Sequence, residues 1–213
     1  TFGHRLGIVT GTGTLYLERG DLPAGIYDEF FSDSGGTVNY GGNNISYDIS
    51  GISEVNHIKF SGTGLMRWKY LPNNDLTIHG DFIVDGGAPR QKYHRDVTIY
   101  GDILFTSGFF AFDYAWYNRI ILAGDADQII QGTLNTNHHQ INQLLINKTG
   151  GTVTISGTLE INGTPYSDLE LQNGYIVTDD SNLLMLGTST TVTGGGNQSF
   201  VRGPVYKNLN IAT

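Results

Sequence analysis

The stretch DLTIHGDFIVDGG at residues 75–87 decides the fold, because DVTIYGDILFTSG at residues 96–108 is nearly the same peptide. The two copies start 21 residues apart, and a period of roughly 20–50 residues is typical of solenoids and other repeat proteins. In each copy apolar and polar residues alternate, which is the period of a β-strand with one buried face. The pattern predicts short β-strands that stack as successive rungs.

Two repeated units run through the rest of the chain. The first returns as TVTISGTLEINGT at residues 152–164 and as DLELQNGYIVTDD at residues 168–180. The second has apolar residues at its first, fourth and sixth positions, and its four copies begin at Val55, Tyr117, Ile141 and Tyr206. No segment keeps a 3.6-residue period, so we expect essentially no α-helix.

Stacking explains why such units repeat. One rung cannot bury its apolar face, whereas parallel rungs pair their backbones and enclose a continuous interior. We therefore predict an all-β fold, a parallel β-helix (β-solenoid), with the right-handed crossovers of nearly all parallel connections. A β-sandwich array would use the same strands, but the short spacing of the matching glycines favours the solenoid.

Composition agrees with a narrow stack of rungs. The 213 residues include 30 Gly and only 5 Pro, and they are 38% apolar and 15% charged. Glycine accepts the positive φ angles of tight turns at low steric cost. We expect residues 1–213 to form a single β-solenoid segment of a longer protein, with irregular first rungs over residues 1–50 and repeated rungs over residues 51–213.

Charge and cysteine content restrict the partners. A net charge of −8 argues against nucleic acid, because an acidic surface repels phosphates. The chain has no Cys, which excludes thiolate metal sites and a cysteine nucleophile. No apolar run approaches the roughly 18 residues of a membrane span, so we expect no membrane insertion.

An aromatic row is the first candidate site. In FFAFDYAWY at residues 109–117, the side chains of Phe110, Phe112, Tyr114 and Trp116 fall on one face of a strand. Flat rings in a row could stack on sugars, which makes this a candidate carbohydrate-binding platform. The interpretation that we favour is that the rings are core, because a narrow solenoid needs large buried side chains.

A basic loop is the second candidate site. Residues 88–95, APRQKYHR, form the one basic cluster in an acidic chain, and Asp81, Asp85 and Asp96 flank it. Polysaccharide lyases with a β-helix use Arg or Lys as a base beside calcium-binding carboxylates. A solvated loop between two matching rungs explains the same residues, so we predict no catalytic residue here.

Other acidic and histidine pairs give no metal site. Asp125 and Asp127 alternate, and Asp179 and Asp180 lie in a turn, where Asp is common. The adjacent His138 and His139 would point to opposite faces of a strand. We predict no metal and no cofactor.

Several phrases resemble a known family. They are GTLYLERGDLPAGIYDEF (13–30), NHIKFSGTG (56–64), the stretch from residue 128 to residue 164 and SNLLMLGTSTTVTGGGNQSFVRGPV (181–205). They are similar to the repeat regions of very large Bacteroidota cell-surface proteins, the adhesins associated with gliding motility and exported by type IX secretion. Residues 84–117 depart most from that repeat style.

The resemblance implies a secreted, elongated segment at the bacterial cell surface. Its function would be structural or adhesive and non-enzymatic. Its partners would be neighbouring repeats of the same chain, and surface polysaccharide or other cell-surface proteins. Two alternatives stay open: a carbohydrate-binding module, and a β-helix polysaccharide lyase or hydrolase.

Overall fold

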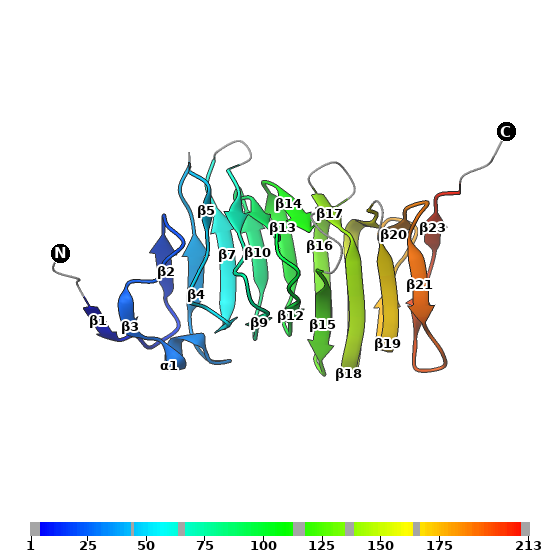
Figure 1. Ribbon diagram of the computed structural model, residues 1–213. Helices are drawn as coiled ribbons and strands as arrows, with labels where there is room; N and C mark the ends of the chain where they lie inside the picture. Colours follow the sequence, from blue (N-terminus) through cyan, green and yellow to red (C-terminus); the bar gives the residue numbers. More distant parts are fainter. Residues whose placement is uncertain are drawn as a thin grey trace.

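The chain folds as a β-solenoid of about eight turns, which confirms the predicted fold class (Figure 1). The structure, a computed structural model, describes residues 5–43, 45–63, 67–112, 118–134, 139–163 and 167–209. All the named strand pairs are parallel, as stacked rungs require. Each turn contributes strands to three faces, which we call A, B and C, and which meet at corners.

The strands of the three faces follow one another in the order C, A, B along the chain. Face A holds β2 (Thr14–Leu17), β4 (Thr37–Tyr40), β7 (His57–Ser61), β10 (Phe82–Asp85), β13 (Ile103–Ser107), β16 (Gln128–Leu134) and β22 (Ser199–Arg202). Face B holds β5 (Tyr47–Asp48), β8 (Lys69–Tyr70), β11 (Pro89–Arg90), β14 (Phe110–Phe112), β17 (His139–Ile141), β20 (Leu183–Leu186) and β23 (Val205–Lys207). Face C holds β6 (Glu54–Val55), β9 (Leu76–Ile78), β12 (Val97–Ile99), β15 (Ile120–Gly124) and β21 (Thr191–Gly194).

Two long strands pass through corners without a break. β18 (Gln143–Ile161) contributes to all three faces, and β19 (Asp168–Val177) contributes to faces C and A. Gly157 makes the corner of β18 between faces A and B, with a φ of +127°, and it stacks on Gly132 of the turn before. A Cβ at Gly157 would lie 2.2 Å from the Gly132 carbonyl oxygen. These corners therefore need glycine for both conformation and space.

The interior is one apolar column. Core-facing residues of face A follow each other at intervals of 20 to 27 residues, as in Val38, Ile58, Phe82, Ile103 and Ile130, and all five are buried. Their neighbours in each strand are less buried, as the sequence alternation predicts.

The first rungs are irregular. β1 (Arg5–Ile8) and β3 (Ala24–Ile26) pair only with each other, in a separate two-stranded sheet. α1 (Asp28–Phe31) is the only helix in the described residues, and it buries Phe30 and Phe31 near one end of the stack (Figure 1). Among those residues, no helix has the length and apolar character needed to cross a membrane.

The repeated peptides do not all occupy equivalent places. DLTIHGDFIV, its copy at residue 96 and the copy at residue 168 cross from face C to face A, whereas the copy at residue 152 crosses from A to B. The second unit behaves likewise, because its copy at Val55 spans the corner between C and A and its copy at Ile141 spans the corner between B and C. Copies of the same repeated peptide thus lie at different corners of the solenoid.

Candidate functional site

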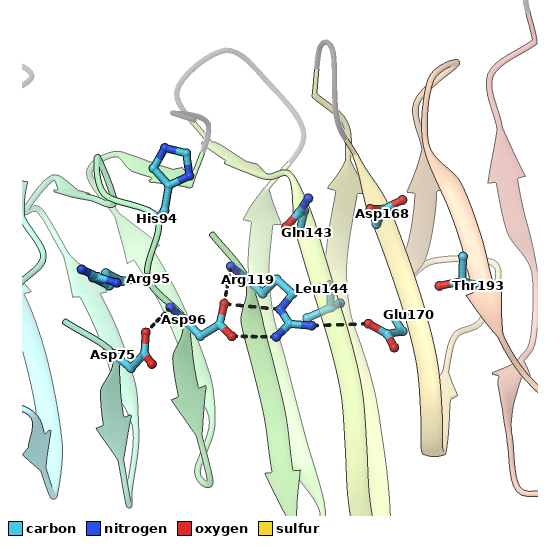
Figure 2. Close-up of a pocket in the computed structure, with 10 residues that line it drawn as sticks. All are labelled: Asp75, His94, Arg95, Asp96, Arg119, Gln143, Leu144, Asp168, Glu170 and Thr193. Carbon is cyan, nitrogen blue, oxygen red and sulfur yellow. Dashed lines mark hydrogen bonds and ion pairs between the residues drawn. The ribbon is translucent and has the colours of Figure 1, made fainter. Parts of the chain in front are cut away.

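A groove of about 460 Å³ runs along the corner between faces B and C (Figure 2). Successive turns place equivalent residues there, because most of the lining residues stand close to the start of a face C strand. The lining residues are Asp75, His94, Arg95, Asp96, Arg119, Gln143, Leu144, Asp168, Glu170 and Thr193. Side chains that are far apart in the sequence therefore form one continuous polar row.

Arg119 lies at the centre of this row. Its Nη2 donates to Asp96 Oδ2 over 2.7 Å and its Nε to Asp96 Oδ1 over 3.3 Å, while Nη1 lies 3.6 Å from Glu170 Oε2 (Figure 2). The hydrogen bonds that Arg119 donates to the Asp96 carboxylate raise the pKa of Arg119 above its ordinary value. Its guanidinium is shared between two carboxylates from different turns.

The carboxylates of the groove also join the turns. Asp75 Oδ1 accepts the backbone N–H of Asp96 over 3.0 Å, and Asp96 Oδ1 accepts the backbone N–H of Arg119 over 3.3 Å. Each carboxylate thus satisfies a backbone donor of the next turn, a group that would otherwise lack a partner at a corner.

The basic loop 88–95 does not form one site. Ala88, Pro89 and Gln91 are buried, and the side chains of Arg90 and Lys92 lie on the outer surface of face B. His94 and Arg95 instead line the groove at the next corner.

The three aspartates that flank this loop lie at three different corners. Asp81 lies between faces C and A, Asp85 lies at the end of face A, and Asp96 lies between B and C. The enzyme alternative would need the loop and these carboxylates to converge on one groove, and of them only Asp96 and the end of the loop, His94 and Arg95, line it.

The aromatic row is core where the structure describes it. Phe110 and Phe112 are fully buried, their ring centres are 5.0 Å apart, and Phe82 lies 5.4 Å from Phe110. These two rings cannot stack on a sugar, so half of the candidate platform belongs to the interior. Tyr114 and Trp116 lie outside the described residues.

The other acidic candidates hold turns together. Asp127 Oδ1 accepts from the backbone N–H and the hydroxyl of Thr152, at 2.8 and 2.9 Å, and these bonds lower the pKa of Asp127. Asp179 Oδ1 accepts the N–H groups of Ser181 and Asn182 in a tight turn. No group of three potential ligands in the described residues could hold a metal ion. His138 and the side chain of His139 lie outside that description.

Buried lysines are functional groups that the sequence analysis missed. Lys69 is 1% exposed, and its Nζ donates to the carbonyl oxygens of Gly42 and Ile45 at 3.0 and 2.6 Å. Lys148 is 2% exposed, and its Nζ donates to Gln128 Oε1 over 2.7 Å. Burial lowers the pKa of both lysines. No sequence signal separates these lysines from surface ones, because their burial follows from the register of the turns.

Comparisons with protein-family models, with curated proteins and with solved structures find no match.

Proposed function

We propose that the chain is a non-enzymatic structural and adhesive segment of a large, secreted bacterial surface protein. One observation carries the proposal: polar side chains at the corners are bonded to the backbone of a neighbouring turn. The acceptors of such N–H groups include Asn43, Asp75, Asp81, Asp102, Asp127 and Asn182. Lys69 and Lys207 donate to carbonyl oxygens of neighbouring turns in the same way.

Such bonds favour a mechanical role. Each turn is joined to the next by three ladders and by corner side chains, so the stack resists bending and shear along its length. The function of a segment like this is to hold other parts of a protein at a distance and to present an outer surface. Surface location, gliding motility and type IX secretion belong to the proposal, and the resemblance of the repeated phrases supports them.

The alternative, a polysaccharide lyase or hydrolase, is favoured by the groove. Arg119 meets Asp96 and Glu170 there, and Arg95 and His94 lie beside them. A sugar chain that lay in the groove would contact both carboxylates and cations, the groups that such enzymes use.

A cleavage experiment separates the two functions. The purified chain is incubated with acidic and neutral polysaccharides, with calcium and with a chelator, and the length of the polysaccharide is followed over time. We expect no shortening. Shortening that is lost in Arg119→Ala, and kept in a matched control at the exposed Arg202→Ala, would contradict the proposal and establish the enzyme.

A further inference from the structure

Face B carries a cluster of cations and aromatic rings on its outer surface. We call it the face-B patch, and it consists of Trp68, Tyr70, Arg90, Lys92 and Tyr93. The Arg90 guanidinium lies 4.9 Å from the centre of the Trp68 ring. Lys92 Nζ lies 4.0 Å from the centre of the Tyr70 ring and 5.1 Å from that of Tyr93.

The patch contains a cavity of about 320 Å³, lined by Tyr70, Arg90, Lys92 and Tyr93. This volume is at the lower end of the range of roughly 300–1,000 Å³ for small-molecule pockets. All four lining residues are partly exposed, so the cations and the phenol groups can reach a ligand. Because ring contacts already hold both cations, a ligand would lose little side-chain freedom on binding.

Charge distinguishes this surface from the rest of an acidic chain. Two of the 12 Lys and Arg residues, Arg90 and Lys92, place their cations together on the outer surface of face B. Within the described strands β5, β8, β11, β14 and β17 of face B, Asp48 is the only acidic residue, and it forms an ion pair with Lys92. The patch is therefore a local positive site on a negative molecule.

We propose that the face-B patch binds an anionic sugar unit, a uronate or a sulfated sugar, within a polysaccharide chain. Arg and Lys recognise a carboxylate or sulfate by charge-assisted hydrogen bonds. The hydroxyls of Tyr70 and Tyr93 can donate to and accept from neighbouring sugar hydroxyls, and their rings offer apolar contact.

This inference deepens the adhesive role proposed above and rests on it, because it gives that role a ligand class. Asp48 provides the sharpest consequence. Its side chain is 55% exposed, and its carboxylate competes with a ligand anion for Lys92. Removing its charge in Asp48→Asn should therefore strengthen binding, an effect that a merely structural ion pair would not produce.

The test measures dissociation constants at one fixed salt concentration for four polymers: polygalacturonate, heparin, fully methyl-esterified galacturonan and polyglutamate. We expect binding to polygalacturonate, to heparin or to both. The comparison of these two polymers shows whether the patch prefers the carboxylates of polygalacturonate or the sulfates of heparin. Lys92→Gln should weaken that binding roughly tenfold, and Asp48→Asn should tighten it severalfold. Lys59→Gln is the matched control, because Lys59 also pairs with an aspartate, Asp85, but on face A, and it should leave binding unchanged.

Several results would overturn the inference. They are no binding to either anionic polysaccharide, equal binding of the methyl ester, equal binding of polyglutamate, or equal loss in Lys59→Gln. Thermal melts confirm that each variant is folded. A negative binding result would overturn the face-B patch as a ligand site without overturning the proposed structural role. That role is tested by polysaccharide cleavage and by force spectroscopy, and neither measurement depends on Lys92.

Discussion

At the scale of the residue, several polar side chains at the corners form hydrogen bonds between turns, and the buried Tyr40 differs from them. Its ring belongs to the interior stack, 6.1 Å from Phe60, and its side chain is fully buried. Its hydroxyl has no hydrogen-bond partner among the described residues. A buried hydroxyl without a partner destabilises the fold by about 1–3 kcal/mol.

Tyr40→Phe should therefore raise the free energy of unfolding by about 1 kcal/mol at neutral pH. Burial, reinforced by Tyr47 and Asp21, raises the pKa of Tyr40 far above its ordinary value. In the unfolded chain the Tyr40 phenol has its ordinary pKa of about 10, whereas in the folded chain its pKa is higher. The folded state therefore keeps its full stability below about pH 10 and loses stability as the pH rises above that value, because the phenol can then ionise only when the chain unfolds.

Urea unfolding at several pH values checks both effects. The wild-type chain should lose stability above about pH 10, and Tyr40→Phe should lose less, with the remaining loss due to Tyr47, whose pKa burial also raises. The exposed Tyr100→Phe is the control. A destabilised Tyr40→Phe variant would mean that the hydroxyl has a partner.

At the same scale, the sequence predicted that Phe110 and Phe112 belong to the core, and the structure confirms it. The sequence did not predict the groove in which Asp96, Arg119 and Glu170 meet. Asp96 and Arg119 are 23 residues apart, and Glu170 is farther still. Their meeting depends on the register between turns of 20 to 29 residues, which the sequence does not show. Because one repeated peptide serves different corners, matching peptides could not supply the register either.

At the scale of the element, strands meet at corners where the ladder hydrogen bonds stop. Asp102 lies at the corner before β13, and its Oδ1 accepts the N–H of Ile129 in β16 over 2.8 Å. The alternation of apolar residues predicted the strands well, since it is a local property. The corner bonds were not predicted, because a turn aspartate looks the same in a sequence whether it faces solvent or the next turn.

Asp102→Ala should lower the free energy of unfolding by about 1 kcal/mol, because it leaves the Ile129 N–H without its acceptor. Asp102→Asn keeps the Oδ1 acceptor and should cost less than half as much. Chemical denaturation of both variants measures the difference, with Asp180→Ala in an exposed turn as control. Equal losses in the Ala and Asn variants would assign the effect to charge and not to the hydrogen bond.

At the scale of the whole molecule, the turns stack from β2 to β23 in one direction, with β1 at one end and β23 near the other (Figure 1). Each turn contacts mainly its neighbours, so unfolding should proceed turn by turn. The class of this architecture followed from the sequence, since repeat length and strand period are visible there. The sequence did not predict that the cross-section has three sides, nor which corner each repeated peptide occupies.

Single-molecule force spectroscopy shows directly whether the bonds between turns make this segment resist pulling. The chain is pulled from its two ends, and its length is followed as force rises. We predict successive steps that each release one turn of 20 to 29 residues, roughly 70–100 Å of extended chain. The step that frees the Asp102 turn should need less force in Asp102→Ala. Smooth extension at low force without steps would contradict the account.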